Sequence, residues 1–510
     1  MITVIDFGAQ YCHLIARKIR ELGVYSEIIP NDVSAEKIKK LNPDGIILSG
    51  GPASVTKKDS PKLDEKILCL GIPVLGICYG HQLLAKMSNG VVSSKQVKEY
   101  GKNELRIIKK SRLLAGLKNK EQVWMSHGDT IMKLPSCFDV VASTKTCRIA
   151  AFENNALKLY GVQFHPEVVH TPHGERILGN FLKICNAKKD WNIKDRKNLI
   201  IKELKEKIKD NAVIVGVSGG VDSLVTSSLL RQATNKLYCV FVDHGLCRKY
   251  ETEYAKKLYS DIKIKNFYIV DAQKLFLSRL KGVSDPEEKR RIIGRTFIEV
   301  FEKKVEDLKK KHGEIKYLGQ GTIYPDRIES AQASKKAAVI KTHHNVGGLP
   351  EKMNLKLVEP LRDFYKDEVR VLGKELGLNH EWLWRHPFPG PGLGVRIVGE
   401  ITDEKLRILR DTDYIFIEEL KKSGHYSKIW QAFAVLLPVK TTGVMGDERT
   451  YEYLIALRAV TSRDAMTADW ARIPEQVLDR ISTRIVNEVR GVNRVVYDIT
   501  QKPPATIEYE

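Results

Sequence analysis

The first 190 residues alternate short apolar runs with segments of helical periodicity. The apolar runs cover residues 2–5, 24–29, 45–48 and 73–75, and the helical spacing covers residues 9–22, 34–41 and 61–69. Strands of a parallel sheet are buried on both faces, so they are continuously apolar, and helices connect them. The pattern therefore predicts a parallel α/β sheet in this part of the chain.

The alternation returns after a charged, polar stretch at residues 188–197. Apolar runs at residues 212–217, 237–242 and 267–270 predict three strands, and residues 286–311 have a long, charged helical pattern. We interpret this region as a second, Rossmann-like α/β domain, because strands and helices again alternate.

The last 125 residues have a different order of elements. We predict strands at 395–398, 431–437, 452–460 and 493–499, and helices at 402–422 and 474–489. This β-α-β-β-α-β order is typical of a small α+β unit. The proline- and glycine-rich residues 385–394 connect it to the preceding region. The fold class is therefore α/β with a small α+β unit, in three predicted domains: 1–188, 189–385 and 386–510.

Composition narrows the classes of protein further. A chain of 510 residues needs several domains, and it has no run of 18 apolar residues and no basic, apolar leader at Met1. Its eight cysteines form no CxxC pair, which favours free thiols in a reducing cytoplasm. The net charge of +21 suggests nucleic acid as one partner. We prefer a lysine-rich solvated surface, and predict no nucleic-acid or membrane partner, because no basic tail or zinc finger is present.

Residues Ser218-Gly219-Gly220-Val221-Asp222-Ser223-Leu224 lie between a predicted strand and a predicted helix. Two glycines permit a tight turn, and the backbone N–H groups and the positive helix end converge where phosphates bind. Asp222 can hold a magnesium ion on those phosphates. The alternative is a plain Gly-Gly turn. The motif lacks the Gly-Lys-Ser/Thr of a P-loop, and it resembles the SGGxDS loop of the ATP pyrophosphatases.

Gly76-Ile77-Cys78-Tyr79-Gly80-His81-Gln82 follows the fourth predicted strand. Small residues around a cysteine between a strand and a helix indicate a nucleophile elbow, where the helix end favours the thiolate. The backbone N–H groups of Gly51 and Tyr79 are candidate oxyanion donors. His165 and Glu167 are the candidate base and its orienting partner.

These motifs resemble those of the class I glutamine amidotransferases over residues 1–188. The resemblance implies that Cys78 attacks the glutamine amide and that His165 protonates the departing ammonia. It also implies that glutamine is held by Gln82 and by residues of the Met125–Asp129 segment, of which we predict Ser126, His127 and Asp129.

Further candidates follow the loop at Ser218. Asp243 ends a predicted strand at the sheet edge where ligands bind, and is a candidate ATP contact. Residues 318–330 present two acids, Asp326 and Glu329, in a glycine-broken loop. Residues 340–350 have the composition of a mobile lid, and we predict roles in adenylation for Lys341, His343 and His344.

The glutaminase motifs, SGGVDS, LGQGTIYPDRIES and IKTHHNVGGLP occur in that order, and the whole chain resembles the glutamine-hydrolysing GMP synthase family. The resemblance implies ATP and Mg²⁺, the substrates XMP and glutamine, an adenylyl-XMP intermediate and a homodimer formed by the last domain. Carried over from the family, the predicted XMP contacts are Arg290, Gln431, Lys502 and Glu508.

Two other functions are compatible with parts of the pattern. An ATP pyrophosphatase that modifies tRNA would use the positive charge, although Cys239 and Cys247 are not arranged as a thiolation pair. A non-catalytic glutaminase-like subunit would not need Cys78, His165 and Glu167 together.

Overall fold

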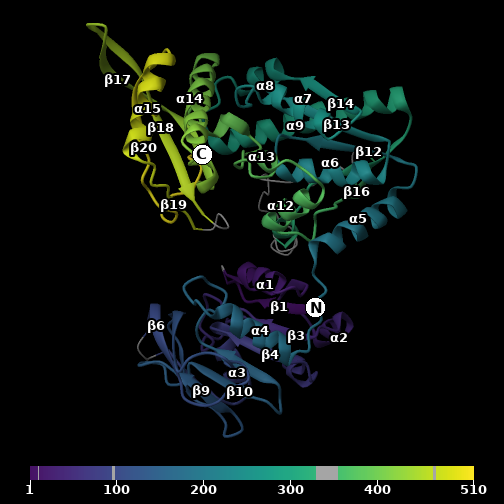
Figure 1. Ribbon diagram of the computed structural model, residues 1–510, viewed down its shortest axis with the longest axis vertical. Helices are drawn as coiled ribbons and strands as arrows, with labels where there is room; N and C mark the ends of the chain where they lie inside the picture. The colour runs from purple at the N-terminus through teal and green to yellow at the C-terminus, as the bar shows by residue number, and fades with distance from the viewer. Residues whose placement is uncertain (10, 95–97, 329–353, 463–466) are drawn as a thin grey trace. The chain divides into compact units, whose positions relative to one another are not determined.

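The computed structural model describes residues 1–9, 11–94, 98–328, 354–462 and 467–510. It divides into two compact units, Met1–Asn192 and Ile193–Glu510. Each unit is built around its own parallel sheet, and the strands and helices of both are labelled in Figure 1. The fold class predicted from the alternating pattern is confirmed.

Unit 1 contains a nine-stranded sheet in the order β2-β1-β3-β4-β11-β10-β9-β6-β7. The first five strands are parallel, and the others extend the sheet in antiparallel pairs. A two-stranded β5-β8 sheet lies outside it. The strands are β1 (Ile2–Asp6), β2 (Ser26–Pro30), β3 (Gly45–Leu48), β4 (Val74–Ile77), β5 (Val91–Ser93), β6 (Glu99–Ile107), β7 (Lys120–His127), β8 (Thr130–Lys133), β9 (Asp139–Ser143), β10 (Ala151–Asn154) and β11 (Leu159–Val162).

The parallel strands of unit 1 are almost completely buried, as their continuous apolar sequence predicts. The helices are α1 (Cys12–Glu21), α2 (Ala35–Leu41), α3 (Tyr79–Met87) and α4 (Gly174–Ile184). The helix predicted at 61–69 is only a short 3₁₀ segment, η1 (Glu65–Cys69). Asp64 caps this segment by accepting a hydrogen bond from the Lys66 N–H.

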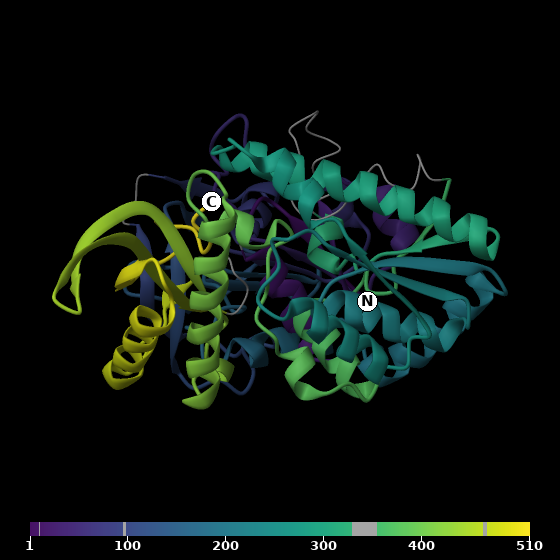
Figure 2. The same ribbon diagram turned by 90° about the horizontal axis from the view of Figure 1, so that it is seen from above.

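Unit 2 begins with a five-stranded parallel sheet in the order β14-β13-β12-β15-β16. Its strands are β12 (Ala212–Val217), β13 (Leu237–Asp243), β14 (Asn266–Asp271), β15 (Ile315–Gly319) and β16 (Lys356–Val358). Its helices are α5 (Ile193–Ile208), α6 (Val221–Ala233), α7 (Glu251–Asp261), α8 (Gln273–Leu280), α9 (Pro286–His312), α12 (Lys366–Glu375) and α13 (His380–Leu383). Figure 2 shows α9 lying across one face of the sheet, with α5, α6 and α12 on the opposite face.

The second part of unit 2 is a four-stranded sheet covered by two helices. The strands β17 (Gln431–Met445) and β18 (Glu448–Thr461) form a long hairpin. The second strand, β18, also pairs with β19 (Asp469–Trp470), antiparallel, and with β20 (Val492–Tyr497), parallel. The helices α14 (Asp403–Lys422) and α15 (Glu475–Glu488) pack on this sheet, and the short η3 (Tyr426–Lys428) follows α14. The hairpin tip reaches beyond both helices (Figure 2).

One predicted strand of this region forms differently. Residues 395–398 were expected to be a strand, but η2 (Gly392–Val395) occupies its beginning and only Ile397 makes a single parallel bridge, to Leu436. The glycines and prolines of the preceding connector favour the tight 3₁₀ turn. The remaining elements lie close to their predicted positions, and the hairpin is longer than predicted.

Candidate functional site

Cys78 occupies the turn between β4 and α3 that the sequence predicts. It is the N-cap of α3 and has the left-handed backbone angle φ = 54°, with ψ = −102°. Two flanking glycines make the turn possible. A Cβ on Gly76 would lie 2.4 Å from the Gly80 carbonyl oxygen, and one on Gly80 would lie 2.4 Å from the Leu48 carbonyl oxygen. The strained turn therefore places the sulfur at the N-terminus of α3.

His165 and Glu167 lie beside this cysteine. His165 Nδ1 is 2.7 Å from Glu167 Oε1, and the Glu167 side chain is completely buried. Burial disfavours protonation of His165. The charge of Glu167, together with the charge and hydrogen bond of Cys78, outweighs this effect and raises the pKa of His165 well above its usual value. Glu167 and Cys78 thus favour the protonated form of His165, which can donate a proton to a departing group.

The two candidate oxyanion donors lie next to each other. A Cβ on Gly51 would lie 3.4 Å from Tyr79 Cγ and 2.7 Å from the Phe7 carbonyl oxygen, so only glycine fits there. Tyr79 is the first residue of α3, where N–H groups have no partner within the helix. On the other side, a Cβ on Gly50 would lie 3.7 Å from Cys78 Cβ. Gly50 and Gly51 thus pack against Cys78 and Tyr79, and the oxyanion role of the Gly51 and Tyr79 N–H groups stays a prediction.

The four residues predicted to bind glutamine also gather around Cys78. The Ser126 carbonyl oxygen accepts a hydrogen bond from the Cys78 thiol at 3.4 Å. Gln82 Nε2 donates to the Asp129 carbonyl oxygen at 2.8 Å, and His127 Nδ1 lies 2.8 Å from the same oxygen. Three of these side chains, those of Gln82, His127 and Asp129, are buried, whereas Ser126 is exposed. Direct contact with glutamine stays a prediction for all four.

The Ser218–Ser223 loop forms the turn from β12 into α6. Ser223 Oγ accepts a hydrogen bond from the Ser218 N–H at 3.2 Å, and Ser218 Oγ accepts one from the Gly220 N–H at 3.2 Å. Tyr259 OH donates to the Ser218 carbonyl oxygen at 3.1 Å. The two serines therefore fold the loop on itself, with Gly220 as the N-cap of α6. Val221 and Leu224 are buried and anchor the helix.

Asp222 lies in the first turn of α6, and its two carboxylate oxygens differ in their hydrogen bonding. Its Oδ2 accepts a hydrogen bond from Lys366, whereas its Oδ1 is buried and has no hydrogen-bond partner among the described residues. An unpartnered buried carboxylate oxygen fits the ligand preference of Mg²⁺. Sequence reasoning missed Lys366, because it lies 144 residues away on α12 and has no motif of its own.

A buried ion pair supports the same loop and was also missed. Arg385 Nη1 lies 2.7 Å from Glu251 Oε1 and 3.2 Å from the Gly219 carbonyl oxygen, and its guanidinium stacks on Tyr254 at 4.2 Å. A Cβ on Gly219 would lie 2.2 Å from atoms of both Arg385 and Glu251. Gly219 is therefore required by this ion pair as well as by any phosphate.

Two of the predicted acids hold loops in place. Asp243 accepts hydrogen bonds from the Gly245 N–H, from Thr252 Oγ1 at 2.7 Å and from Gln273 Nε2. Asp326 accepts one from the Ile323 N–H at 3.1 Å. The other predicted residues of the adenylation loops, Glu329, Lys341, His343 and His344, lie outside the described residues.

Gln431 and Glu508, predicted as XMP contacts, are bonded to each other. Gln431 Nε2 donates to Glu508 Oε1 at 2.7 Å, and Arg396 makes a bidentate pair with the same carboxylate at 2.9 and 3.0 Å. Arg396 is completely buried and stacks over Phe433 at 4.1 Å. No sequence pattern marks Arg396, because a buried arginine is recognised only from its tertiary partners.

The other two predicted XMP contacts lie elsewhere along the C-terminal segment. Arg290, in the first part of α9, donates to the Glu510 carbonyl oxygen. Lys502 exchanges backbone hydrogen bonds with Ala468 at 2.8 and 3.0 Å. Buried Arg458 holds the tail between these points by donating to the carbonyl oxygens of Thr500, Thr506 and Ile507. The C-terminal tail is therefore docked on the rest of unit 2.

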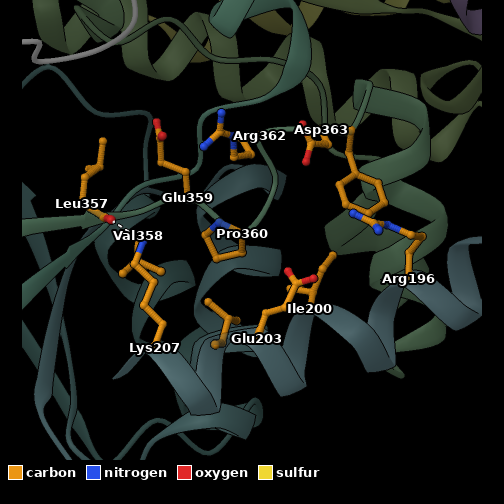
Figure 3. A pocket seen from close by; sticks show the side chains of 12 residues that line it. Arg196, Ile200, Glu203, Lys207, Leu357, Val358, Glu359, Pro360, Arg362 and Asp363 are labelled. Atoms are coloured by element: carbon orange, nitrogen blue, oxygen red, sulfur yellow. Dashed lines mark hydrogen bonds between the residues drawn. The ribbon is translucent and has the colours of Figure 1, made fainter. Parts of the chain in front are cut away.

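A pocket of about 190 Å³ lies between α5 and residues 357–364. Figure 3 shows Ile200 and Glu203 projecting from α5 toward Pro360. None of its lining residues is a predicted site residue, and Glu359 instead accepts a hydrogen bond from Thr322 at 2.6 Å. We interpret it as a surface hollow beside the loop that leads to Asp326, and not as the reaction site.

Among the described residues, none of the helices combines the length and the apolar character needed to cross a membrane. Comparison with protein families gives three matches. Residues 3–185 match the family described as glutamine amidotransferase class-I, residues 212–297 match the queuosine biosynthesis protein QueC family, and residues 418–509 match the GMP synthase C terminal domain.

Curated relatives match the chain along its full length. A protein of Carboxydothermus hydrogenoformans named GMP synthase [glutamine-hydrolyzing] is 56% identical over 100% of this chain and 99% of its own length. Proteins with the same name from Clostridium botulinum and Clostridium kluyveri are each 54% identical over the same shares. The chain therefore belongs to the glutamine-hydrolysing GMP synthase family.

Proposed function

We propose that this chain aminates XMP to GMP, using ATP and the ammonia that it releases from glutamine. The observation that carries the proposal is a buried Cys78–His165–Glu167 site in the same chain as a folded SGGVDS loop. Full-length relatives named GMP synthase [glutamine-hydrolyzing] support the same reading, and so does the family match at residues 418–509. The competing tRNA-modifying function would explain the loop but not the last domain.

The first reaction is glutamine hydrolysis at Cys78. The thiolate attacks the amide carbon, and the Gly51 and Tyr79 N–H groups stabilise the negative oxygen that forms. His165, held protonated by Glu167, donates its proton to the departing ammonia as the thioester forms. The neutral ring then takes a proton from water, which attacks the thioester and releases glutamate.

The second reaction activates XMP. The C2 oxygen of XMP attacks the α-phosphate of ATP, and pyrophosphate leaves. A carbonyl oxygen is a poor leaving group, but its adenylyl ester leaves as AMP when ammonia attacks C2. The Ser218–Ser223 loop and Lys366 would hold the departing phosphates, after exchanging their present hydrogen bonds for bonds to phosphate oxygens.

Asp222 is the residue that would hold Mg²⁺, through its unpartnered Oδ1. The ion would neutralise charge on the departing pyrophosphate. The fit is chemical, since a carboxylate oxygen and phosphate oxygens are the ligands this ion prefers. Asp243 and Asp326 would hold the ATP and adenylation loops in shape, because their carboxylates already accept backbone and side-chain hydrogen bonds there.

XMP would bind beside the docked C-terminal segment. Glu508 is partly exposed and is bonded to buried Gln431 and Arg396, and substrate binding there would exchange some of these hydrogen bonds for bonds to the purine. Arg290 and Lys502 would supply positive charge for the phosphate. These roles come from the family motif, and the hydrogen bonds of Glu508 support them.

We also propose three domains, 1–188, 189–385 and 386–510, in a cytoplasmic homodimer. The hairpin of β17 and β18 supports the dimer. It leaves Val439, Val444 and Tyr451 at least 50% exposed on an extended arm, and apolar side chains gathered on a surface mark protein–protein contacts. Sedimentation equilibrium of the purified chain would test this part of the proposal.

The test of the main proposal compares two nitrogen sources. Cys78→Ala should lose GMP formation from glutamine and keep formation from ammonium chloride. Cys69→Ala, at an exposed cysteine of the same unit, is the matched control and should retain both. AMP release that depends on tRNA and not on XMP would contradict the proposal, as would loss of both nitrogen sources in a folded Cys78→Ala protein.

A further inference from the structure

A buried ion pair lies beneath the segment that faces the Cys78 thiol. His127 Nε2 is 3.0 Å from Glu99 Oε2, and the side chains are 1% and 3% exposed. Glu99 Oε1 accepts hydrogen bonds from Thr144 Oγ1 at 2.7 Å and from Thr146 Oγ1. Glu99 lies on β6, directly opposite His127 on the neighbouring strand β7. Its carboxylate accepts hydrogen bonds from several donors at once.

The hydrogen bonds of His127 fix the orientation of its ring. Its Nδ1 faces the Asp129 carbonyl oxygen at 2.8 Å, and a carbonyl oxygen only accepts. Its Nε2 faces the Glu99 carboxylate. Burial alone would raise the pKa of Glu99, but hydrogen bonds from His127, Thr146 and Thr144 outweigh it and lower that pKa. The ring is therefore held at both nitrogens, by the Asp129 carbonyl oxygen on one side and by the Glu99 carboxylate on the other.

The His127 ring connects Glu99 to the predicted glutamine site. The Asp129 carbonyl oxygen accepts from His127 and also from Gln82, four residues after Cys78. The Asp129 carboxylate accepts from Ser54 Oγ at 2.6 Å, three residues after the candidate oxyanion donor Gly51. The Ser126 carbonyl oxygen contacts the thiol itself. The Glu99–His127 pair thus belongs to a hydrogen-bond network that joins residues 126–129 to Gln82 and Ser54.

We propose that Glu99 is a positioning residue for the glutaminase reaction, which holds the His127 ring so that residues 126–129 keep the geometry that binds glutamine. This inference rests on the proposed function of Cys78. Glu99 carries no motif in the sequence, and it contacts neither the thiol nor His165 in any recorded hydrogen bond among the described residues. Its effect passes through His127.

A metal ion is a weaker explanation of the same residues. Donor atoms of Glu99, His127 and Cys147 lie within 4.8 Å of one another. However, burial and the nearby charge of Glu99 raise the pKa of the Cys147 thiol to about 12, so an ion would have to displace a tightly held proton from the sulfur. An ion would also have to break the Glu99–His127 hydrogen bond. On α3, burial and the nearby His127 lower the pKa of His81 to about 3.

The test uses the full chain and the two nitrogen sources. Glu99→Ala should lower kcat/KM for glutamine on the order of 10²-fold, mainly through KM, because small displacements in a site have effects of this size. Its kcat with ammonium chloride should stay within about twofold of wild type, since that reaction needs only unit 2. Glu99→Gln should recover most of the loss, because an amide donates to a neutral His127 whose Nδ1 still donates to Asp129.

Two further variants separate positioning from folding. Glu104→Ala removes a carboxylate from the same strand at an exposed position, and should leave both activities unchanged. Thr146→Val removes one donor to Glu99 and leaves the Glu99–His127 pair in place, and it should raise KM for glutamine a few-fold. It replaces Glu99→Ala as the test if Glu99→Ala does not fold. Wild-type KM for glutamine in folded Glu99→Ala, or no recovery in Glu99→Gln, would overturn the inference. Glutamine-dependent activity in Cys78→Ala would instead overturn the proposed function.

Discussion

Replacing Glu167 by glutamine should weaken glutamine hydrolysis in a way that the structure lets us estimate. Glu167 Oε1 accepts the His165 Nδ1 hydrogen bond at 2.7 Å, and its other oxygen is buried without a partner among the described residues. At an effective dielectric constant of about 20, unit charges about 4 Å apart attract by about 4 kcal/mol. In Glu167→Gln, the side-chain amide oxygen still accepts the His165 Nδ1–H hydrogen bond, and this bond retains about 1–1.5 kcal/mol of the stabilisation.

The net loss of stabilisation for protonated His165 is therefore about 3 kcal/mol. Since each 1.36 kcal/mol is a factor of ten, kcat/KM for glutamine should fall on the order of 100-fold. The same change lowers the pKa of His165, so the protonated ring is lost at a lower pH. The alkaline limb of the glutamine-dependent rate should therefore move to lower pH, because the wild-type charge of Glu167 raises that pKa.

The assay follows GMP formation with saturating XMP and ATP, with glutamine or ammonium chloride as the nitrogen source. Glu121→Gln is a matched control, because Glu121 Oε2 lies 2.7 Å from His173 Nδ1 in the same unit, but His173 is 49% exposed. Exposed pairs contribute at most about 1 kcal/mol, so the control should differ little from wild type. An unchanged rate with glutamine in Glu167→Gln, or an equal fall with both nitrogen sources, would refute the reasoning.

Three other predictions concern unit 2. Asp222→Asn should lower AMP release on the order of 10²-fold with either nitrogen source, and undiminished release would remove the proposed Mg²⁺ role from Asp222. Arg385→Lys should raise KM for ATP about tenfold, because it loses the bidentate pair with Glu251 that holds the Ser218 loop; equal ATP saturation curves would contradict this. Burial lowers the pKa of His244 and His386 to about 4, below the 6.5 of an unfolded chain. Unit 2 should be most stable above pH 6.5 and lose up to about 1.4 kcal/mol per pH unit per histidine between pH 6.5 and 4, measured by urea unfolding.

Features that depend on neighbours in the sequence were predicted well. The parallel strands, the α6 and α9 helices and the turns at Cys78 and Ser218 follow from apolar runs, glycines and helix starts within a few residues of each other. The exceptions are also local. At 395–398, a strand was predicted from apolar residues, but the glycines before it favour a 3₁₀ turn, so only one bridge forms.

The supporting contacts of the sites were not predictable in the same way. Lys366 meets Asp222 across 144 residues of chain, Arg396 meets Glu508 across 112, and Arg385 meets Glu251 across 134. Lys366, Arg396, Arg385 and Glu251 carry no pattern that distinguishes them from a solvated lysine, arginine or glutamate. Their partners are chosen by which strands and helices the topology brings together.

The amino-acid order by itself thus predicted most elements of both units, the candidate nucleophile Cys78 with His165 and Glu167, and the candidate phosphate loop, because each motif is encoded within a short stretch. Only the tertiary structure decided how those groups are held. Glu99 and His127 are 28 residues apart, and they become a buried hydrogen-bonded pair because β6 and β7 place them in the same register. Burial then makes the pair effective, since a charge removed from water depends on the few partners that remain.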